Sequence, residues 1–256
     1  MNQVLDTIFK HRSIRKYKNQ PLEEEKLQLI LYLIKAAQAA PSWCNGEQVS
    51  IIVIKEQSLK EKIRDLCWKQ PFISECPVFL IFCADFYRVS IAFEKAGKTK
   101  EEFEKYMSNI DTLIIGSHDV GISLQNATVA AESLGLGTVD IGAIRGKSIE
   151  VSKELNLPKY CIPLIGLCIG YPDIDPSLKP RFPPKSVCFE NKYNTDLAKT
   201  GVDEYDEIYK KYLAERKNNP RDGNWSFTIA KIYTSHYDNQ DSELLKQQGF
   251  IDLDKK

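Results

Sequence analysis

The chain has 256 residues, of which 43% are hydrophobic, so it is long enough to form one large globular domain with a substantial core. Its 35 basic residues balance its 35 acidic residues, which excludes an overall charge that would favour nucleic acid or an acidic membrane surface. No signal-like N-terminus occurs and no apolar run reaches the ~18 residues of a transmembrane helix, so we expect a cytoplasmic protein without a membrane segment.

The first elements predicted along the chain are helices. Apolar residues at helical spacing predict a short helix that begins after Asn2 and ends near His11. A second helix is predicted from Pro21 to a point before Pro41, because proline suits a first helical turn and acidic residues 23–25 suit its positive end. Strands and helices then alternate. A strand is predicted at 50–54, a helix at 58–68 and a second strand at 78–83. A charged helical excursion is predicted after them, at 92–107.

The longest predicted helix runs from 111 to 134, and its apolar residues cover most of its circumference, which indicates burial on several sides. Gly135 and Gly137 end it. The elements predicted after it are a strand at 138–144, a helix at 149–155 and a strand at 162–169. This order predicts an α/β (α+β) domain with a central mixed β-sheet flanked by helices.

After about residue 172 the composition changes to proline, charged and aromatic residues. Because such a segment does not easily form its own core, we expect a long C-terminal arm that covers the main body or a partner subunit. Helices are predicted in it near 202–216 and 242–247. We treat residues 1–256 as a single domain, with a core at about 1–172 and a C-terminal extension at about 173–256.

The cysteines and histidines do not indicate a metal site. Seven cysteines without CxxC spacing predict neither a disulfide framework nor a zinc site, and this usage is typical of a reducing cytosol. Cys83, Cys161 and Cys168 lie in apolar runs, where cysteine usually behaves as a small buried side chain. The histidines are too dispersed to share a metal ion. They are His11, His118 and His236.

Two basic clusters that are far apart in the sequence are candidates for the two halves of one anion site. They are His11-Arg12-Ser13-Ile14-Arg15 and Lys179-Pro180-Arg181. Arginine, histidine and serine supply charge-assisted hydrogen-bond donors that suit a phosphate. The alternative for either cluster taken alone is a charged surface in contact with water.

Two further segments place polar or small residues beside predicted strands. Residues 39–48 leave a helix and enter a strand through side chains suited to ligand oxygens and ring nitrogens, although a plain connecting loop is the alternative. Asp140-Ile141-Gly142-Ala143 places a glycine where the backbone can approach a flat ligand. The sequence contains no GxGxxG, Walker, HExxH or GxSxG motif, so these nucleotide, metal and nucleophile sites are not supported.

In their order along the chain, these motifs resemble those of the nitroreductase family, in particular its larger oxygen-insensitive, NADPH-dependent nitroreductase and flavin reductase branch. The motifs are His11 to Arg15, Ala40-Pro41-Ser42 with Asn45 and Gln48, Ala130 to Gly137, Ile141-Gly142, Leu167 to Pro172, and Lys179-Pro180-Arg181. The resemblance covers residues 8 to 190 well and the tail more loosely. It implies an interface-sharing homodimer that binds FMN and takes electrons from NADPH or NADH.

The resemblance also assigns roles to individual residues. It implies that the two basic clusters form a phosphate site. At the flavin ring, it implies that Arg15 places a cation near the pyrimidine edge, that Gln70 contacts the ring edge and that the backbone amide of Gly142 faces N5. Ser42 is implied as a ribityl or ring contact. The implied cofactor-binding residues are His11, Arg12, Ser13, Arg15, Ser42, Asn45, Gln70, Asp140, Ile141, Gly142, Ala143, Lys179 and Arg181. Those implied for NADPH are Arg216, Lys217 and Arg221.

The implied reaction passes hydride from NAD(P)H through flavin N5 to nitroaromatics, quinones or free flavin in a ping-pong cycle, so the protein needs no catalytic side chain. The implied partners are small planar electron acceptors and a second copy of the chain. This sequence has Asp140 and Ala143 where the branch has an aromatic residue and a second glycine, a difference beside the ring. The alternatives are a specialised flavoprotein of the same fold, such as a reductive dehalogenase with residues 88–107 as a lid, and a flavin-binding regulator without turnover.

Overall fold

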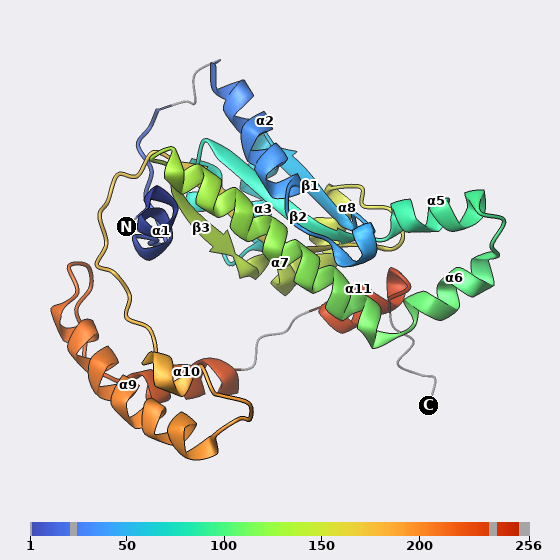
Figure 1. The fold of residues 1–256 in the computed structure, drawn as a ribbon. Coiled ribbons are helices and arrows are strands. Elements are labelled where there is room, and N and C mark those ends of the chain that lie inside the picture. Colours follow the sequence, from blue (N-terminus) through green and yellow to red (C-terminus); the bar gives the residue numbers. More distant parts are fainter. Residues whose placement is uncertain (1, 21–24, 236–239, 251–256) are drawn as a thin grey trace. The chain divides into compact units, whose positions relative to one another are not determined.

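The computed structural model describes residues 2–20, 25–235 and 240–250. The chain divides into two compact units, Met1–Ile174 with Asp238–Lys256, and Asp175–Tyr237. Figure 1 shows the helices and strands of both units.

The first unit is built on one four-stranded sheet in the order β1-β2-β4-β3, and every neighbouring pair is antiparallel. The strands are β1 (Val49–Ile54), β2 (Val78–Asp85), β3 (Gly137–Ile141) and β4 (Cys161–Gly170). The α/β class is confirmed, but parallel pairing in the described residues is limited to an isolated bridge between Ser13 and Thr138. The predicted mixed sheet is corrected in this respect. Because β2 is buried along its whole length, its unbroken apolar run resembles that of a parallel strand.

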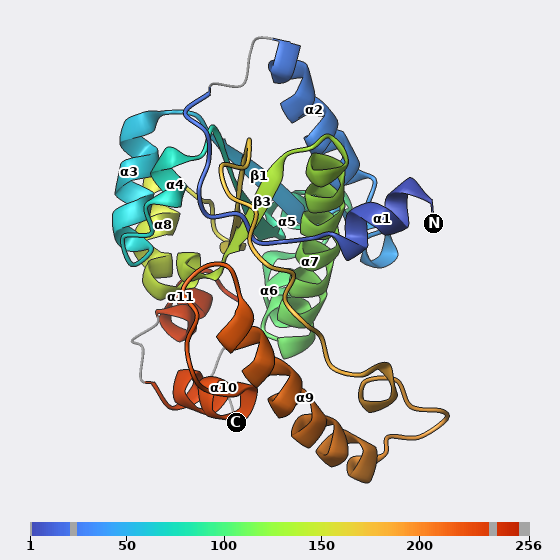
Figure 2. The ribbon, with the colours of Figure 1, turned by 90° about the vertical axis from the view of Figure 1, so that its left-hand side faces the viewer.

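Helices cover both faces of this sheet, as Figure 2 shows. One face is covered by α2 (Glu25–Gln38) and α7 (Ile110–Ser133), and the other by α3 (Gln57–Leu66), α4 (Phe72–Glu75) and α8 (Ser148–Glu154). Successive side chains of β2 alternate between the two faces, so that Leu80 and Phe82 belong to the first core and Phe79 and Ile81 to the second. The predicted start of α2 at Pro21 lies outside the described residues.

Helix α7 spans nearly the predicted range, but its burial differs from the prediction. Its buried residues form one stripe, at positions 112, 115, 116, 119, 120, 123, 124, 127, 128 and 131. Apolar residues elsewhere on it, such as Ile110 and Ile114, are 55% and 59% exposed. The prediction that α7 is buried on several sides is therefore wrong within one chain, because only this stripe packs against the sheet and α2.

The charged excursion is helical, as predicted, but it consists of two helices, α5 (Tyr87–Lys95) and α6 (Lys100–Met107). Gly97, with φ of 73°, separates them, and Thr99 begins α6 with a capping box. Phe103 packs edge-on against Phe93 and Tyr160, with ring centroids 5.2 and 4.9 Å apart. At the N-terminus, α1 (Gln3–Phe9) is capped by Asn2, as expected.

Two element ends differ from the predictions. Helix α3 ends at Leu66, because the chain turns into left-handed conformations at Trp68 and Lys69, with φ of 54° and 55°, without the glycine that usually marks such a stop. Strand β3 ends at Ile141, and residues 142–144 lie in the 3₁₀ helix η2 (Gly142–Lys147) instead of the strand. A second unpredicted 3₁₀ turn, η1 (Trp43–Asn45), precedes β1.

The second unit contains η3 (Pro184–Ser186), α9 (Thr195–Glu215) and α10 (Trp225–Thr234). The expectation that this tail lacks a core is wrong, because Tyr205, Tyr209 and Leu213 form a small buried cluster on α9. Phe182 stacks on Tyr205 with ring centroids 4.1 Å apart, and Trp225 meets Phe182 edge-on at 4.9 Å. Helix α9 begins earlier than predicted, and α10 was not predicted at all.

The C-terminal helix α11 (Asp241–Gln247) belongs to the first unit, in nearly the predicted range. Leu244 and Phe250 are buried there, and the backbone N–H of Tyr160 donates to the carbonyl of Gln248 at 3.1 Å. Residues 240–250 therefore contribute to the main core.

The cysteines are free thiols, and Cys83, Cys161 and Cys168 are buried as predicted. A hydrogen bond with Cys161, followed by burial, raises the pKa of the Cys83 thiol. Among the described residues no group of three or more His, Cys, Asp or Glu side chains could hold a metal ion. None of the helices in the described ranges combines the length and the apolar character needed to cross a membrane. His236 lies outside those ranges.

Candidate functional site

The basic segment that follows α1 is held in an extended conformation beside the start of β3. Ser13 pairs with Thr138, and the backbone N–H of Ile14 donates to the Thr138 carbonyl at 2.8 Å. The Ile14 side chain is buried over Gly137, where an added Cβ would lie only 2.6 Å from Ile14 Cγ1. Because neighbours in an extended segment point to opposite sides, this burial turns Ser13 and Arg15 to the other side.

Tyr17 fixes the far end of the same segment. Its hydroxyl donates to the Ile14 carbonyl at 2.9 Å and lies 3.3 Å from the Cys168 carbonyl, and its backbone pairs with Pro172. Burial is the main reason that the pKa of Tyr17 is raised above its ordinary value, so the hydroxyl keeps its proton. The predicted phosphate donors are thus attached to the sheet at both ends.

His11 lies at the end of α7, next to a carboxylate. Its Nδ1 is 2.7 Å from Glu132 Oε1, and the Thr138 hydroxyl donates to the same oxygen at 2.6 Å. Asp140 is close enough to interact electrostatically with both His11 and Glu132. Partial burial of its carboxyl group raises the pKa of Asp140, an exposed residue, and His11 opposes that rise.

The glycine predicted to face flavin N5 lies at the other end of β3. Gly142 opens η2, and a Cβ added there would meet only the Arg145 guanidinium, at 3.5 Å. Arg145 Nη1 donates to the Leu164 carbonyl at 3.0 Å, which ties this turn to β4. The Gly142 backbone can therefore be approached closely, whereas Ile141 and Ala143 are buried.

Gln70 belongs to the turn between α3 and α4, and this turn lies next to η2. A Cβ on Gly146 would be 3.2 Å from Trp68 Nε1, so the indole rests on the η2 backbone. Gln70 is half-buried, two residues further along. The Gln70 turn and Gly142 therefore lie on neighbouring elements at the end of β3, whereas the His11 segment lies beside its start.

The loop with Ser42 and Asn45 lies at the opposite edge of the sheet, before β1. Its turn is held by Asp119, which is 1% exposed and accepts from the Trp43 N–H at 3.1 Å, and by the Ser42 hydroxyl, which donates to Glu47 at 3.1 Å. Asn45 takes a left-handed conformation, with φ of 55°. Because β1 and β3 are the two edge strands, this loop is not brought to the His11 segment within one chain.

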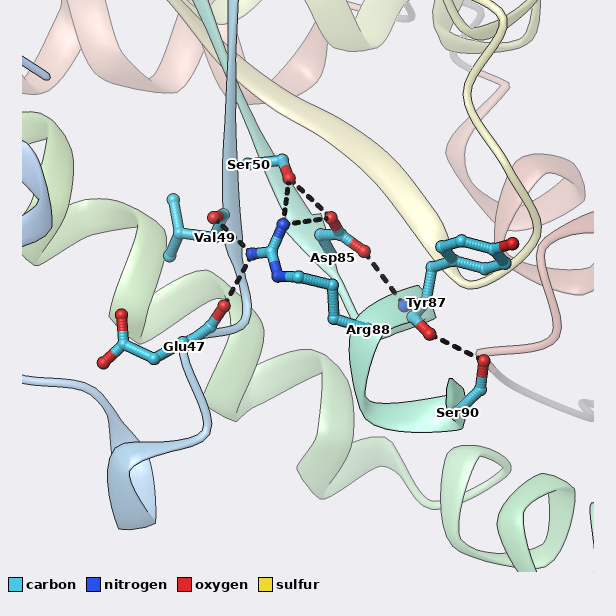
Figure 3. Close-up of polar contacts among 7 residues, drawn as sticks. All are labelled: Glu47, Val49, Ser50, Asp85, Tyr87, Arg88 and Ser90. Carbon is cyan, nitrogen blue, oxygen red and sulfur yellow. Dashed lines mark hydrogen bonds and ion pairs between the residues drawn. The ribbon is translucent and has the colours of Figure 1, made fainter. Parts of the chain in front are cut away.

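Arg88 attaches the end of this loop to the sheet, as Figure 3 shows. Its Nη2 donates to the carbonyls of Glu47 and Val49 at 2.6 and 2.7 Å, and its Nη1 donates to the Ser50 hydroxyl at 2.8 Å and to Asp85 at 3.0 Å. The Asp85 side chain is 7% exposed, so the guanidinium also compensates a largely buried negative charge.

The remaining predicted residues belong to the second unit. Arg181 Nη1 donates to the Lys179 carbonyl at 3.0 Å, and the Tyr205 hydroxyl donates to the Pro180 carbonyl at 2.9 Å, so this segment is anchored on α9. A contact between it and the His11 segment stays a prediction.

The three residues predicted for NADPH lie together on the loop after α9. Arg216 donates from Nε to the Asn219 carbonyl at 2.7 Å, Lys217 forms an ion pair with Asp175 at 2.9 Å, and the Arg221 N–H donates to the Leu213 carbonyl at 2.9 Å. Their role stays a prediction.

Comparison with known proteins agrees with this geometry. The model of the nitroreductase family matches residues 8–171, and that of the family's C-terminal domain matches residues 179–252. The chain belongs to the nitroreductase family.

The relatives found within this family match over nearly their whole length. An FMN reductase [NAD(P)H] of Bacillus subtilis is 43% identical over 98% of both chains. An oxygen-insensitive NADPH nitroreductase of Salmonella typhimurium is 34% identical over 98% of this chain and 99% of its own. The solved structure of B. megaterium NfrA2 has a TM-score of 0.91 and 41% identity, with coverage of 98% of this chain and 99% of that one.

Several residues that shape the candidate site were not predicted from the sequence. They are Asp119, Glu132 and Thr138, which anchor the Ser42 loop and His11, and Arg88 and Arg145, which attach loops to the sheet. Glu132 and Asp119 were recognisable only as charged residues in an otherwise apolar helix, the kind of position that usually needs a partner.

Proposed function

We propose that this protein is an FMN-dependent oxidoreductase that passes hydride from NAD(P)H to nitroaromatics, quinones or free flavin. The observation that carries the proposal is the basic segment His11 to Arg15, held beside β3 in a chain that is 43% identical to an FMN reductase [NAD(P)H]. The proposed electron donor is NADPH or NADH, with Arg216, Lys217 and Arg221 as candidates for contact with the NADPH phosphate.

The residues of the first unit fit FMN in charge and in spacing. The imidazole, guanidinium and hydroxyl groups at residues 11 to 13 are suited to a phosphate and lie beside Thr138, at the start of β3. Gly142, with its accessible backbone, follows the end of that strand, about 14 Å away at the usual rise per residue. A phosphate at one end of β3 and a ring at the other is the arrangement that an extended ribityl chain requires.

When bound, FMN would supply hydride acceptance and donation at N5, so we expect ping-pong kinetics. The protein would bind and orient it. His11, Arg12 and Ser13 would hold the phosphate, together with Lys179 and Arg181. The Gly142 N–H would donate to the ring near N5, and the Arg15 guanidinium would stabilise negative charge at the pyrimidine edge.

We further propose that the active form is a homodimer with shared sites. Ser42 and Asn45 lie at the β1 edge, whereas the phosphate segment and Gly142 lie at the β3 edge, so these groups can meet at one ligand only if a second copy supplies one set. Exposed apolar side chains on α1 and α7, which pack together, offer a surface for that copy. Among them, Val4 is 58%, Phe9 62% and Ile114 59% exposed.

Initial rates test the reaction. Double-reciprocal plots against NADPH at several acceptor concentrations should give parallel lines, because donor and acceptor would use the site in turn. Intersecting lines would contradict the ping-pong cycle, and NADPH oxidation that does not depend on an acceptor would contradict transfer to it.

Subunit complementation tests the shared site. Ser42→Arg blocks the loop and Arg15→Ala removes the cation, so each homodimer should lose activity. In the mixed dimer, one site would take its phosphate segment from the first variant and its loop from the second, and would carry neither substitution. Mixing should therefore restore activity, whereas no recovery after demonstrated subunit exchange would refute sharing.

A further inference from the structure

One carboxylate in the first unit is placed to control the protonation of His11. Glu132, near the end of α7, has a side chain that is 12% exposed, and its Oε1 accepts from two groups, His11 Nδ1 at 2.7 Å and the Thr138 hydroxyl at 2.6 Å. Thr138 is fully buried on β3. The carboxylate is therefore held from two elements, and the imidazole is aligned against it.

This contact decides which ring nitrogen can act on a ligand. A carboxylate only accepts hydrogen bonds, so Nδ1 must carry a proton to meet it. In the neutral ring, Nε2 then presents a lone pair, which repels an anion. Only the imidazolium can donate from Nε2 while it keeps its bond to Glu132, and a neighbouring carboxylate favours that charged form.

We propose that Glu132 is a positioning residue for flavin phosphate binding, which bonds to His11 Nδ1 and favours the imidazolium, so that Nε2 donates to the phosphate. The inference rests on the proposed FMN site. The chain thereby obtains a phosphate donor whose charge depends on pH, in addition to the permanently charged Arg12.

The other charges around His11 define how this can be tested. Asp140 faces it from β3, and Lys10 and Arg12 flank it in its own segment. Asp140 interacts electrostatically with His11 and could compensate the imidazolium in place of Glu132, whose Oε1 lies 2.7 Å from Nδ1. The two carboxylates can be separated by substitution.

The test compares FMN with riboflavin, which lacks the phosphate, on the full chain after removal of flavin. Glu132→Gln keeps an oxygen that accepts both hydrogen bonds and removes only the charge. We expect FMN affinity to fall about tenfold, the loss of one charge-assisted contact, with riboflavin affinity changed less than about twofold. The pH above which FMN affinity declines should also move down, because the imidazolium loses its counter-charge.

Two controls accompany this variant. Glu154→Gln removes an exposed carboxylate, paired with Lys62 at 3.1 Å, and should leave both affinities unchanged. In a His11→Gln background, Glu132→Gln should have no further effect on FMN affinity, since Glu132 would act through His11. Nitrogen NMR of labelled histidine should find His11 Nδ1 protonated throughout the titration in the unsubstituted protein.

Each alternative result is distinguishable. Equal weakening of FMN and riboflavin, or a neutral His11 protonated at Nε2, would overturn the role of Glu132. If Glu132→Gln leaves the pH dependence of FMN affinity unchanged and Asp140→Asn abolishes it, the role belongs to Asp140 instead. If the unsubstituted protein binds neither flavin, the proposed function itself fails.

Discussion

Replacing Gly137 with alanine should displace the phosphate segment and destabilise the fold. The new Cβ would lie 2.6 Å from Ile14 Cγ1, 2.8 Å from Ile14 Cβ and 3.0 Å from Ile14 Cγ2. Ile14 is 6% exposed, so it has little room to turn aside, and the segment must move away from β3 by roughly 0.8 Å to reach an ordinary contact distance. This movement stretches the 2.8 Å bond from the Ile14 N–H to the Thr138 carbonyl.

The expected cost follows from these two effects. Overpacking of this kind destabilises by about 1–3 kcal/mol, and loss of a backbone hydrogen bond adds about 1 kcal/mol, so unfolding should become easier by about 2–4 kcal/mol. For a chain of this size the thermal midpoint should fall by roughly 5–15 °C. Because Ser13 and Arg15 move with Ile14, FMN affinity should also fall, by about tenfold.

The assay is thermal unfolding together with FMN titration, and Ile14→Ala provides the internal comparison. That substitution removes Cγ1 and Cγ2, two of the three close atoms, so Gly137→Ala should cost clearly less in its background than in the unsubstituted protein. Equal costs in the two backgrounds, or an unchanged FMN affinity in Gly137→Ala, would refute this reasoning.

Three further predictions concern single side chains. Arg88→Met removes the bonds to Glu47, Val49, Ser50 and Asp85, and should lower the free energy of unfolding by about 2–4 kcal/mol in urea titrations, with partial recovery by Asp85→Asn because the buried charge is then gone. Burial raises the pKa of Asp140, so its ionisation lowers the stability of the fold as the pH rises from the ordinary pKa through the raised one. Asp140→Asn should abolish this pH dependence and slightly raise the thermal midpoint at neutral pH. A lower midpoint in the variant would contradict this cost of ionisation. Arg15→Ala should lower the reduction potential of bound flavin in spectroelectrochemical titration, and an unchanged potential would exclude Arg15 as the stabilising cation.

The parts of the fold that the sequence predicted well are those with strong local signals. Strands β2 and β4 and helix α7 carry long apolar runs, and their observed bounds lie close to the predicted ranges. Strand direction was not predictable, because a strand covered on both faces has the same apolar run whichever way its neighbours point. The aromatic core of the second unit had a signal that was overlooked, since Tyr205, Tyr209 and Leu213 recur every four residues.

The candidate site was predictable in composition and less so in geometry. Residue type alone left the basic cluster open between an anion site and a charged surface in contact with water, and its order with the other motifs favoured the site. Its partners could not be recognised, because His11 and Glu132 are 121 residues apart and meet only when α1 packs on α7. The left-handed turn at Trp68 occurs without glycine, so the local sequence did not indicate it, whereas Asn45, also left-handed, precedes Gly46 in an Asn-Gly pair typical of turns.

The visible spectrum of the protein, followed anaerobically through additions of NADPH and then NADH, tests the proposed function most directly. We expect flavin absorbance that is bleached by about one equivalent of donor per chain and restored when a quinone or nitroaromatic acceptor is added. A colourless protein that takes up no FMN, or bound flavin that stays oxidised with both donors, would contradict an FMN oxidoreductase.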